Sequence, residues 1–242
     1  MKHFDRPFRI IFCWDIDRFI SHDGTVPLLL MNADAKAPQK TNFTTSDNVV
    51  LEAEYIIPSS CSAIAVLSHP HPLYGGDMRN IVIQDLFNRL PEASIAALRY
   101  NFRGVQNSAG SHGDGETEVF DSQGAFRFAS ALAQGKPVIS VGYSFGADVS
   151  LTADDPTLAG WVGIAAPLAL LAPHEMSAGA DTRPTKLLVP ENDQFRSVAE
   201  AQEICTNWKK TSVEAISGAD HFFSTGTKTL SERVADFVVT FF

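Results

Sequence analysis

The sequence predicts a single α/β domain with a mostly parallel central sheet and helices on both faces. Two observations support this prediction: short apolar runs alternate with amphipathic segments, and several of these runs lack the polar alternation of half-exposed strands. The chain has 242 residues, of which 45% are hydrophobic and 19% charged, so it can bury a substantial core. No internal repeat or low-complexity segment interrupts the pattern.

The regular pattern begins near residue 49. From Leu51 to Ile57, apolar and acidic residues alternate, which is typical of a strand with one wet face. Uninterrupted apolar runs at Ala63–Leu67 and Ser94–Leu98 predict strands buried on both faces. Between them, the apolar residues from Ile83 to Leu90 recur at helical spacing, and Asp77 is the expected N-cap of that helix.

The second half continues the alternation. A glycine-rich loop is expected over Asn101–Gly115, followed by a helix over Glu116–Ala133 and a buried strand over Val138–Tyr143. A helix follows this strand, and the last helix carries an apolar stripe from Leu230 to Phe241. The remaining predicted elements are strands at Trp161–Ala165, Lys186–Val189 and Val213–Ile216 and a helix at about Val198–Trp208.

The N-terminal part of the chain is less regular. Phe8–Phe12 has the composition of a strand, whereas Asp34–Lys40 has that of an exposed connector. We therefore expect residues 1–40 to be an N-terminal extension of unknown role and residues 41–242 to form the domain.

Charge and cysteine content exclude several classes of protein. The formal net charge of −9 opposes binding to nucleic acid or to an anionic membrane surface. No apolar stretch approaches the length of a membrane span. The three cysteines, at positions 13, 61 and 205, match no metal knuckle and no redox pair, which favours a reducing compartment. We expect a cytoplasmic protein, and the sequence leaves its oligomeric state open.

A serine lies where an apolar strand gives way to a helix, in the segment Gly142–Gly146 (GYSFG). A sharp strand–turn–helix exposes such a serine and holds it in strained backbone geometry, an arrangement called the nucleophile elbow. Small residues are needed at both ends because strand and helix run close together there. The pattern predicts Ser144 as a nucleophile.

Acid and base candidates follow two later strands. Asp193 comes shortly after the strand that ends at Val189, and His221 follows the strand that ends at Ile216. The order Ser144, Asp193, His221 is the one this kind of fold uses for nucleophile, acid and base. His221 would accept the hydroxyl proton and later donate it to the leaving group, while Asp193 would orient the imidazole. Nearby carboxylates compete with Asp193 for the role of the acid, namely Glu191 and Asp220.

An oxyanion hole needs two donors. One is expected to be the backbone N–H of Phe145, and the other should come from the loop at residues 68–76. Pro70 and Pro72 lack an N–H, which leaves the backbone N–H of His71 as the predicted second donor. The fallback donors are the amides of Leu73 and Tyr74.

A metal site is the rival interpretation of this loop. His69 and His71 are potential ligands, but no third ligand is evident beside them. We therefore expect neither a metal nor a cofactor.

Four segments together resemble a known group, the small lidless α/β-hydrolases of the dienelactone-hydrolase-like and serine-aminopeptidase-like branch. The resemblance runs from about residue 45 to the C-terminus. It implies Ser144 as nucleophile, Asp193 as acid and His221 as base, with the residue 69–76 loop beside the oxyanion. The segments that carry it are HPHPLYGG at 69–76, RYNFRG at 99–104, GYSFG at 142–146 and GADHFF at 218–223.

The chain departs from this group at two positions, because similar sequences usually have glycine where Gln106 and Pro190 stand. Both differences concern loop geometry. About twenty residues separate the strands ending near Ala166 and starting near Lys186, too few for a helical cap, so we expect an open site. Arg103 is expected to hold its own glycine-rich loop rather than to bind substrate.

These residues predict a metal-independent serine hydrolase that cleaves a small-molecule carboxylic ester or thioester through an acyl-enzyme. Two alternatives remain open at the level of the sequence. One is a peptidase acting on short peptides, and the other is a binding protein that keeps the fold without turnover.

Overall fold

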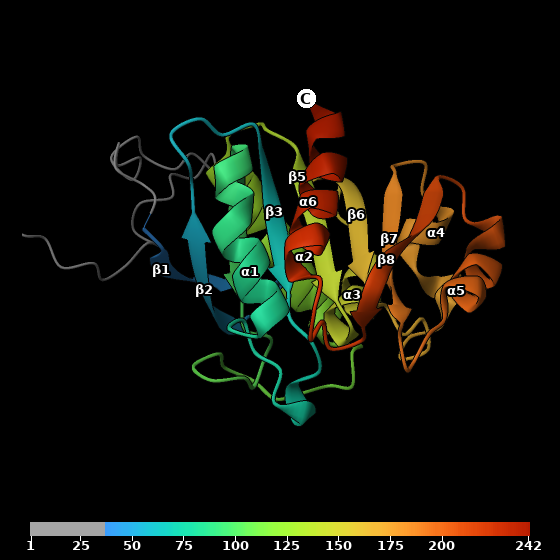
Figure 1. The fold of residues 1–242 in the computed structure, drawn as a ribbon. Coiled ribbons are helices and arrows are strands. Elements are labelled where there is room, and N and C mark those ends of the chain that lie inside the picture. Colours follow the sequence, from blue (N-terminus) through green and yellow to red (C-terminus); the bar gives the residue numbers. More distant parts are fainter. Residues whose placement is uncertain (1–36) are drawn as a thin grey trace, which may run out of the picture. The chain divides into compact units, whose positions relative to one another are not determined.

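An eight-stranded sheet organises residues 37–242, the part of the chain that this computed structural model describes. The strand order is β1-β2-β4-β3-β5-β6-β7-β8 (Figure 1). All pairs from β4 to β8 are parallel, whereas β1 and β2 are antiparallel to their neighbours. The strands are β1 (Gln39–Thr44), β2 (Val50–Ile56), β3 (Ala63–Ser68), β4 (Ile95–Tyr100), β5 (Val138–Tyr143), β6 (Leu158–Ile164), β7 (Thr185–Asn192) and β8 (Thr211–Asp220).

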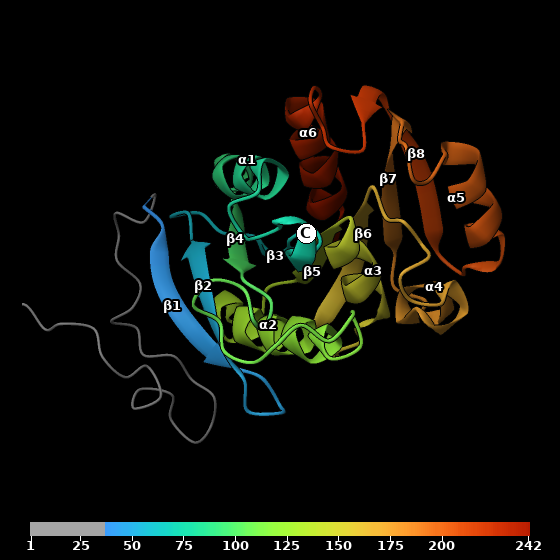
Figure 2. The ribbon, with the colours of Figure 1, turned by 90° about the horizontal axis from the view of Figure 1, so that it is seen from below.

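Helices cover both faces of this sheet, as predicted (Figure 2). α1 packs with α6 on one face, and α2 packs with α3 on the other. Among residues 37–242, no helix combines the length and apolar character needed to cross a membrane. The helices are α1 (Ile81–Arg89), α2 (Glu118–Ala133), α3 (Phe145–Thr152), α4 (Ser177–Ala180), α5 (Val198–Ile204) and α6 (Thr227–Val238).

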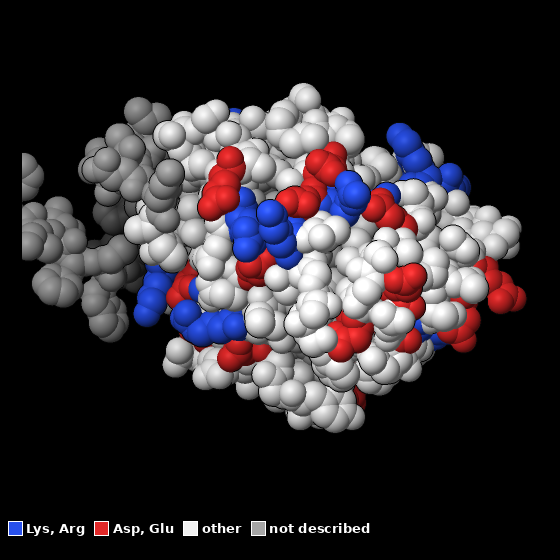
Figure 3. Space-filling model, viewed as in Figure 1, with Lys and Arg blue, Asp and Glu red and all other residues white. Residues whose placement is uncertain are grey.

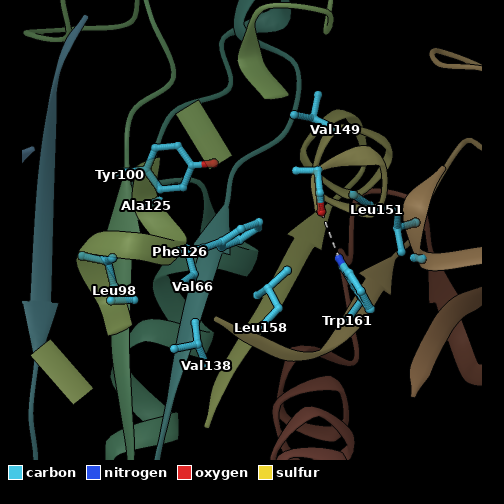
Figure 4. Packing of buried hydrophobic residues seen from close by; sticks show 14 of the residues in the cluster. Val66, Leu98, Tyr100, Ala125, Phe126, Val138, Val149, Leu151, Leu158 and Trp161 are labelled. Atoms are coloured by element: carbon cyan, nitrogen blue, oxygen red, sulfur yellow. Dashed lines mark hydrogen bonds between the residues drawn. The ribbon is translucent and has the colours of Figure 1, made fainter. Parts of the chain in front are cut away.

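The sheet separates two hydrophobic cores. Every residue of β3 is buried, and successive side chains enter opposite cores: Ala65 and Leu67 join α1 and α6, whereas Ile64 and Val66 join α2 and α3. This explains why the run lacks polar alternation. Figure 4 shows part of the second core, where the indole N–H of Trp161 donates to the Ala153 carbonyl at 3.3 Å.

The segment between β6 and β7 forms no cap over the carboxyl ends of the strands. The segment that joins them contains only a short 3₁₀ turn at Pro173–Glu175 and the four-residue helix α4. The expectation of a lidless fold is therefore confirmed, and the C-terminal edge of the sheet is free of a helical lid.

The predicted connector at Asp34–Lys40 contains the start of a strand. β1 starts at Gln39, within the predicted connector, and pairs with β2 from Gln39 opposite Tyr55. Its polar composition concealed it, because only Thr41 and Phe43 are buried. Phe8–Phe12 and Cys13 lie outside the described residues, and the division into an extension at 1–40 and a domain at 41–242 stays a prediction.

Two helix boundaries also differ. Asn80, not Asp77, is the N-cap of α1, because its side chain accepts the Val82 N–H at 3.0 Å. The Asp77 carboxylate instead accepts the N–H of Arg79. α5 ends at Ile204 and a 3₁₀ turn over Cys205–Asn207 follows, so the predicted helix is shorter by one turn.

Acidic and basic side chains are interspersed on the face seen in Figure 3, which is the face covered by α1 and α6 in Figure 1. Ion pairs account for part of this mixing. Arg89 and Asp85 of α1 lie 2.9 Å apart, and Arg233 of α6 lies 3.0 Å from Glu214 of β8. Such exposed pairs contribute little to stability.

A buried ion pair joins the antiparallel part of the sheet to the parallel part. Glu54 of β2 lies directly opposite Arg99 of β4, and their charged groups are 2.6 Å apart. Burial raises the pKa of Glu54, but hydrogen bonds from Arg99 and Arg79 outweigh it, and the pKa is below its ordinary value. The guanidinium also stacks 4.0 Å from the Phe87 ring centroid. Neither buried charge is left alone.

Replacing Arg99 by methionine should therefore destabilise the fold strongly. Arg99→Met leaves the buried Glu54 carboxylate with only the half-exposed Arg79, and we expect a loss of about 3 kcal/mol in the free energy of unfolding. Urea denaturation at pH 7 measures this loss. The matched control Arg89→Met, which breaks an exposed pair, should unfold close to the wild-type midpoint, and equal losses in the two variants would contradict the argument.

Candidate active site

Ser144 occupies a strained turn between β5 and α3. Its backbone has φ 54° and ψ −119°, a left-handed conformation that non-glycine residues rarely adopt. The turn is held because the Ser144 N–H donates to the Ile164 carbonyl of β6 at 2.9 Å. α3 begins at the next residue, as the nucleophile-elbow pattern predicts.

Two glycines permit this turn. A Cβ at position 142 would come within 2.3 Å of the Gly146 carbonyl oxygen, and a Cβ at position 146 within 2.4 Å of the Ser68 carbonyl oxygen. The contacting atoms are backbone and cannot move aside. Any larger residue would therefore push α3 away from β3 and β5, so the spacing of the two glycines fixes the position of Ser144.

The structure brings the three predicted catalytic side chains together. The hydroxyl of Ser144 lies 3.0 Å from Nε2 of His221, and Nδ1 of His221 lies 3.0 and 3.1 Å from the two Asp193 carboxylate oxygens. Because a carboxylate only accepts, Nδ1 carries the proton, which leaves Nε2 free to accept from the serine. The Asp193 side chain is fully buried and that of His221 is 6% exposed. This geometry suits proton transfer from Ser144.

Asp193 follows β7 in a loop that fixes its carboxylate. One oxygen accepts the backbone N–H groups of Phe195 and Arg196, at 2.8 and 3.2 Å. The Arg196 Nε–H in turn donates to the carbonyl of Pro167 in the loop after β6. The Asp193 carboxylate is therefore held by its own loop, which is in turn tied to the neighbouring one.

The two competing carboxylates have other partners. Glu191 accepts from the Ser217 hydroxyl and the Gly218 N–H, at 3.0 and 2.8 Å. Asp220 accepts from the N–H and hydroxyl of Ser224. Of the carboxylates that the sequence offered, Asp193 is the one in contact with the imidazole.

Further groups around His221 were not anticipated from the sequence. The side-chain oxygen of Gln194 accepts the His221 N–H at 3.1 Å, and the Tyr143 hydroxyl donates to the His221 carbonyl at 2.8 Å. The rings of Phe195 and Phe222 lie against the imidazole, with centroid separations of 4.4 and 5.3 Å. The two hydrogen bonds fix the backbone of His221, and the two rings form an apolar surface beside its imidazole. Only tertiary structure could have revealed them.

The two predicted oxyanion donors lie on neighbouring segments. Phe145 is the first residue of α3, so its N–H has no acceptor within the helix. The His71 ring packs 4.7 Å from the Phe145 ring, which places the loop after β3 against the start of α3. Both fallback amides are used inside the loop: Leu73 N–H donates to His71 Nδ1 and Tyr74 N–H to the His71 carbonyl. The role of the His71 N–H stays a prediction.

His69 has a structural position. Its Nδ1 donates to the Pro70 carbonyl at 2.7 Å, and its Nε2 accepts the Phe102 N–H at 3.1 Å. Burial lowers the pKa of His69 from 6.5 to about 4, against the opposing effect of the Pro70 hydrogen bond. The neutral ring thus joins the loops after β3 and β4 and has no nitrogen free for a metal. Within residues 37–242, no group of three potential ligands is arranged to hold a metal ion.

Asp148, one turn after Ser144, holds the loop that follows β6. Its buried carboxylate accepts three backbone N–H groups, from Leu168, Ala169 and Leu170, at 2.9 to 3.1 Å. Burial raises the pKa of Asp148 to about 6 although these hydrogen bonds lower it. The helical spacing from Ser144 was visible in the sequence, but the partner loop was not.

The glycine-rich loop after β4 is held as predicted. The buried Arg103 guanidinium pairs with Asp121 of α2 at 2.7 Å and with Asp47 at 2.9 Å, so it is not free to bind substrate. Gln106 adopts φ 51°, a conformation in which glycine is less strained, and its side-chain amide donates to Asp77. A cavity of about 260 Å³ lies between this loop and the loop after β3, lined by residues 72–73, 75–77 and 103–106 and by His112.

Comparison with known proteins places the chain among related sequences and folds. No protein-family model matches it. The uncharacterized protein RP471 of Rickettsia prowazekii is 30% identical over 204 residues, which covers 78% of this chain and 84% of that protein. An α/β serine hydrolase homologue from Coxiella burnetii superposes with a TM-score of 0.73 at 26% identity, covering 82% of this chain and 96% of that one.

A third match supports the architecture. The Xanthomonas campestris protein XC6422, described as an α/β serine hydrolase without a lid, has a TM-score of 0.74 at 21% identity and covers 87% of this chain and 97% of its own. Together with the sheet order and the uncovered strand ends, these likenesses confirm the α/β-hydrolase fold without a lid.

The buried His69 predicts a specific dependence of stability on pH. The pKa of His69 is about 4 in the folded protein and 6.5 when unfolded, so protons favour the unfolded chain. The contribution of His69 to the free energy of unfolding is fully present above about pH 6.5 and falls as the pH drops toward 4, by about 2–3 kcal/mol between pH 7 and 4.5. Urea denaturation over this range measures it.

His69→Gln removes this titration and should flatten the pH dependence by the same amount. His174→Gln, which replaces an exposed histidine, is the matched control and should keep the wild-type slope. A His69→Gln slope indistinguishable from wild type would show that His69 takes up its proton equally well in the folded state.

Proposed function

We propose that this chain, which belongs to the same protein family as RP471 of Rickettsia prowazekii, is a metal-independent serine hydrolase that cleaves small carboxylic esters or thioesters. The observation that carries the proposal is the uninterrupted chain of contacts from the Ser144 hydroxyl through the His221 imidazole to the Asp193 carboxylate. The hydrolase fold of the structural neighbours supports it.

In the first half of the reaction, Ser144 Oγ attacks the carbonyl carbon of the substrate and its proton passes to Nε2 of His221. The Asp193 carboxylate stabilises the imidazolium that forms. The tetrahedral intermediate then collapses, the bond from carbon to the leaving oxygen or sulfur breaks, and Nε2 returns the proton to that atom. An alcohol or thiol departs, and the acyl group stays on Ser144.

Water completes the second half. A water molecule attacks the acyl carbon while Nε2 of His221 accepts its proton. Collapse breaks the bond to Ser144 Oγ, which takes the proton back, and the carboxylic acid leaves. The absence of a helical lid over the described strand ends suits this step, because water can reach the acyl-enzyme.

The oxyanion that develops in both halves needs donors at the start of α3. The N–H of Phe145 lies in the first turn of α3 and has no acceptor within the helix, and the helix dipole also favours negative charge there. We assign the second donor to the backbone N–H of His71, because this loop packs directly against Phe145. Loss of one such donor typically lowers kcat by about 100- to 1,000-fold.

Replacing Ser144 should abolish covalent labelling. A fluorophosphonate probe should phosphonylate the wild-type protein at Ser144, whereas Ser144→Ala should show no label, because the nucleophilic oxygen is gone. Gel fluorescence and intact-protein mass spectrometry measure the adduct. Ser150→Ala, a buried serine in the same helix, is the control and should label like wild type. Full labelling of Ser144→Ala would remove this serine from the mechanism, and an unlabelled wild type would favour a binding protein.

The assignment of Asp193 as the acid leads to a second prediction, on kcat. Asp193→Asn should lower kcat by about 10⁴-fold, since the amide cannot hold the imidazole with Nδ1 protonated. The controls Glu191→Gln and Asp220→Asn alter carboxylates that do not contact the imidazole and should stay within a few-fold of wild type. Initial rates with p-nitrophenyl acetate measure these effects. A larger loss in either control than in Asp193→Asn would transfer the acid role.

A further inference from the structure

Two exposed aromatic rings flank the imidazole of His221. Phe195 follows the acid by two residues and Phe222 follows the base directly, and their side chains are 59% and 61% exposed. Both rings contact the imidazole edge to face, and their centroids are 6.3 Å apart. Large apolar side chains gain free energy when a partner covers them, so these rings form an apolar surface beside the base.

Proton transfer from His221 brings the leaving group of the substrate next to this apolar surface. Nε2 of His221 must come within hydrogen-bonding distance of the leaving oxygen or sulfur in order to protonate it. The group attached to that atom then lies next to the imidazole, where it can contact the rings of Phe195 and Phe222 that pack against it. The acyl group, in contrast, is attached to the carbon held at Ser144 and the oxyanion donors.

We propose that Phe195 and Phe222 are specificity-determining residues that bind the leaving group, and that they select alcohols or thiols with an aromatic or long apolar part. This inference rests on the proposed serine hydrolase activity. It adds to that activity the substrate class: esters whose leaving group, rather than whose acyl group, is large and apolar.

Charges near the two rings oppose an anionic leaving group. Asp193, Asp220 and Glu191 all lie within four residues of a ring along the chain; Glu191 is exposed and Asp220 is half-buried. The nearby guanidinium of Arg196 donates to the Pro167 carbonyl and lies 3.8 Å from Glu200. The surface therefore favours neutral leaving groups.

The test compares two esters with the same acyl group, 2-naphthyl acetate and ethyl acetate. Phe195→Ala and Phe222→Ala should each lower kcat/KM for the naphthyl ester roughly 3- to 10-fold, the effect of a lost aromatic contact, and leave ethyl acetate within 2-fold. Phe242→Ala is the matched control, because this exposed phenylalanine lies at the C-terminus, at the opposite end of the sheet from the site (Figure 1).

Deacylation separates a binding role from a merely structural one. Both esters give the same acetyl-enzyme, and the leaving group has departed before it is hydrolysed. The rate of deacylation, measured by the steady-state phase after a burst, should therefore be unchanged in both variants. Equal losses for both esters, or a slower deacylation, would overturn the proposal, since the rings would then only position His221.

A binding measurement keeps this result separate from the proposed activity. Ser144→Ala should bind 2-naphthol, detected by quenching of its fluorescence, and the double variants with Phe195→Ala or Phe222→Ala should bind it several-fold more weakly. If the wild type hydrolyses no ester but 2-naphthol binding still depends on the two rings, the hydrolase proposal fails and the aromatic surface stands. If binding is independent of both rings, the surface itself is refuted.

A tenfold preference of the wild type for 4-acetoxybenzoate over phenyl acetate would contradict the selection for neutral leaving groups.

Discussion

The close approach of α3 to β5 and β3 is the constraint on which the rest of the site depends. Gly142 and Gly146 let three backbone segments meet at distances that no Cβ allows, and the turn between them forces Ser144 to a positive φ. Such a conformation costs on the order of 1–3 kcal/mol, and it persists because the strand, the helix and the hydrogen bond to Ile164 hold it from both sides. The same turn exposes the hydroxyl and frees the first N–H of α3.

Buried polar side chains fix the loops around this turn. His69 joins the loops after β3 and β4, Asp148 holds the loop after β6, and Asp193 is bound by amides of its own loop after β7. Because β3 to β8 all run parallel, these loops emerge together at the carboxyl ends of the strands. A buried polar group loses water and must find partners in fixed directions, so each of these residues orders backbone that would otherwise be free to move.

The parts of the molecule that could be predicted from sequence are those with local signatures. The buried strands are apolar runs, the elbow is a five-residue pattern, and the order of Ser144, Asp193 and His221 follows from the order of the strands. β1 was missed because a half-buried edge strand with polar residues looks like a connector. The N-cap was misplaced because Asp77 and Asn80 are both good caps, and only the path of the chain decides between them. The roles of His69 and Asp148 depend on partners 33 and 20 or more residues away, which spacing alone does not reveal.

The uncovered strand ends determine how such a site can select its substrate. A cap would bury most of a ligand and recognise it along its length, whereas here the described residues offer only loop side chains close to the reacting atoms. On the proposed mechanism, discrimination then comes from groups close to the scissile carbonyl, namely the proposed oxyanion donors on one side and the two rings beside His221 on the other. Since Phe195 and Phe222 also contact the base, binding a large apolar leaving group would cover the imidazole from water at the moment it carries charge, and would strengthen its attraction to Asp193. Recognition of the leaving group would thus take place on the two rings that pack against His221.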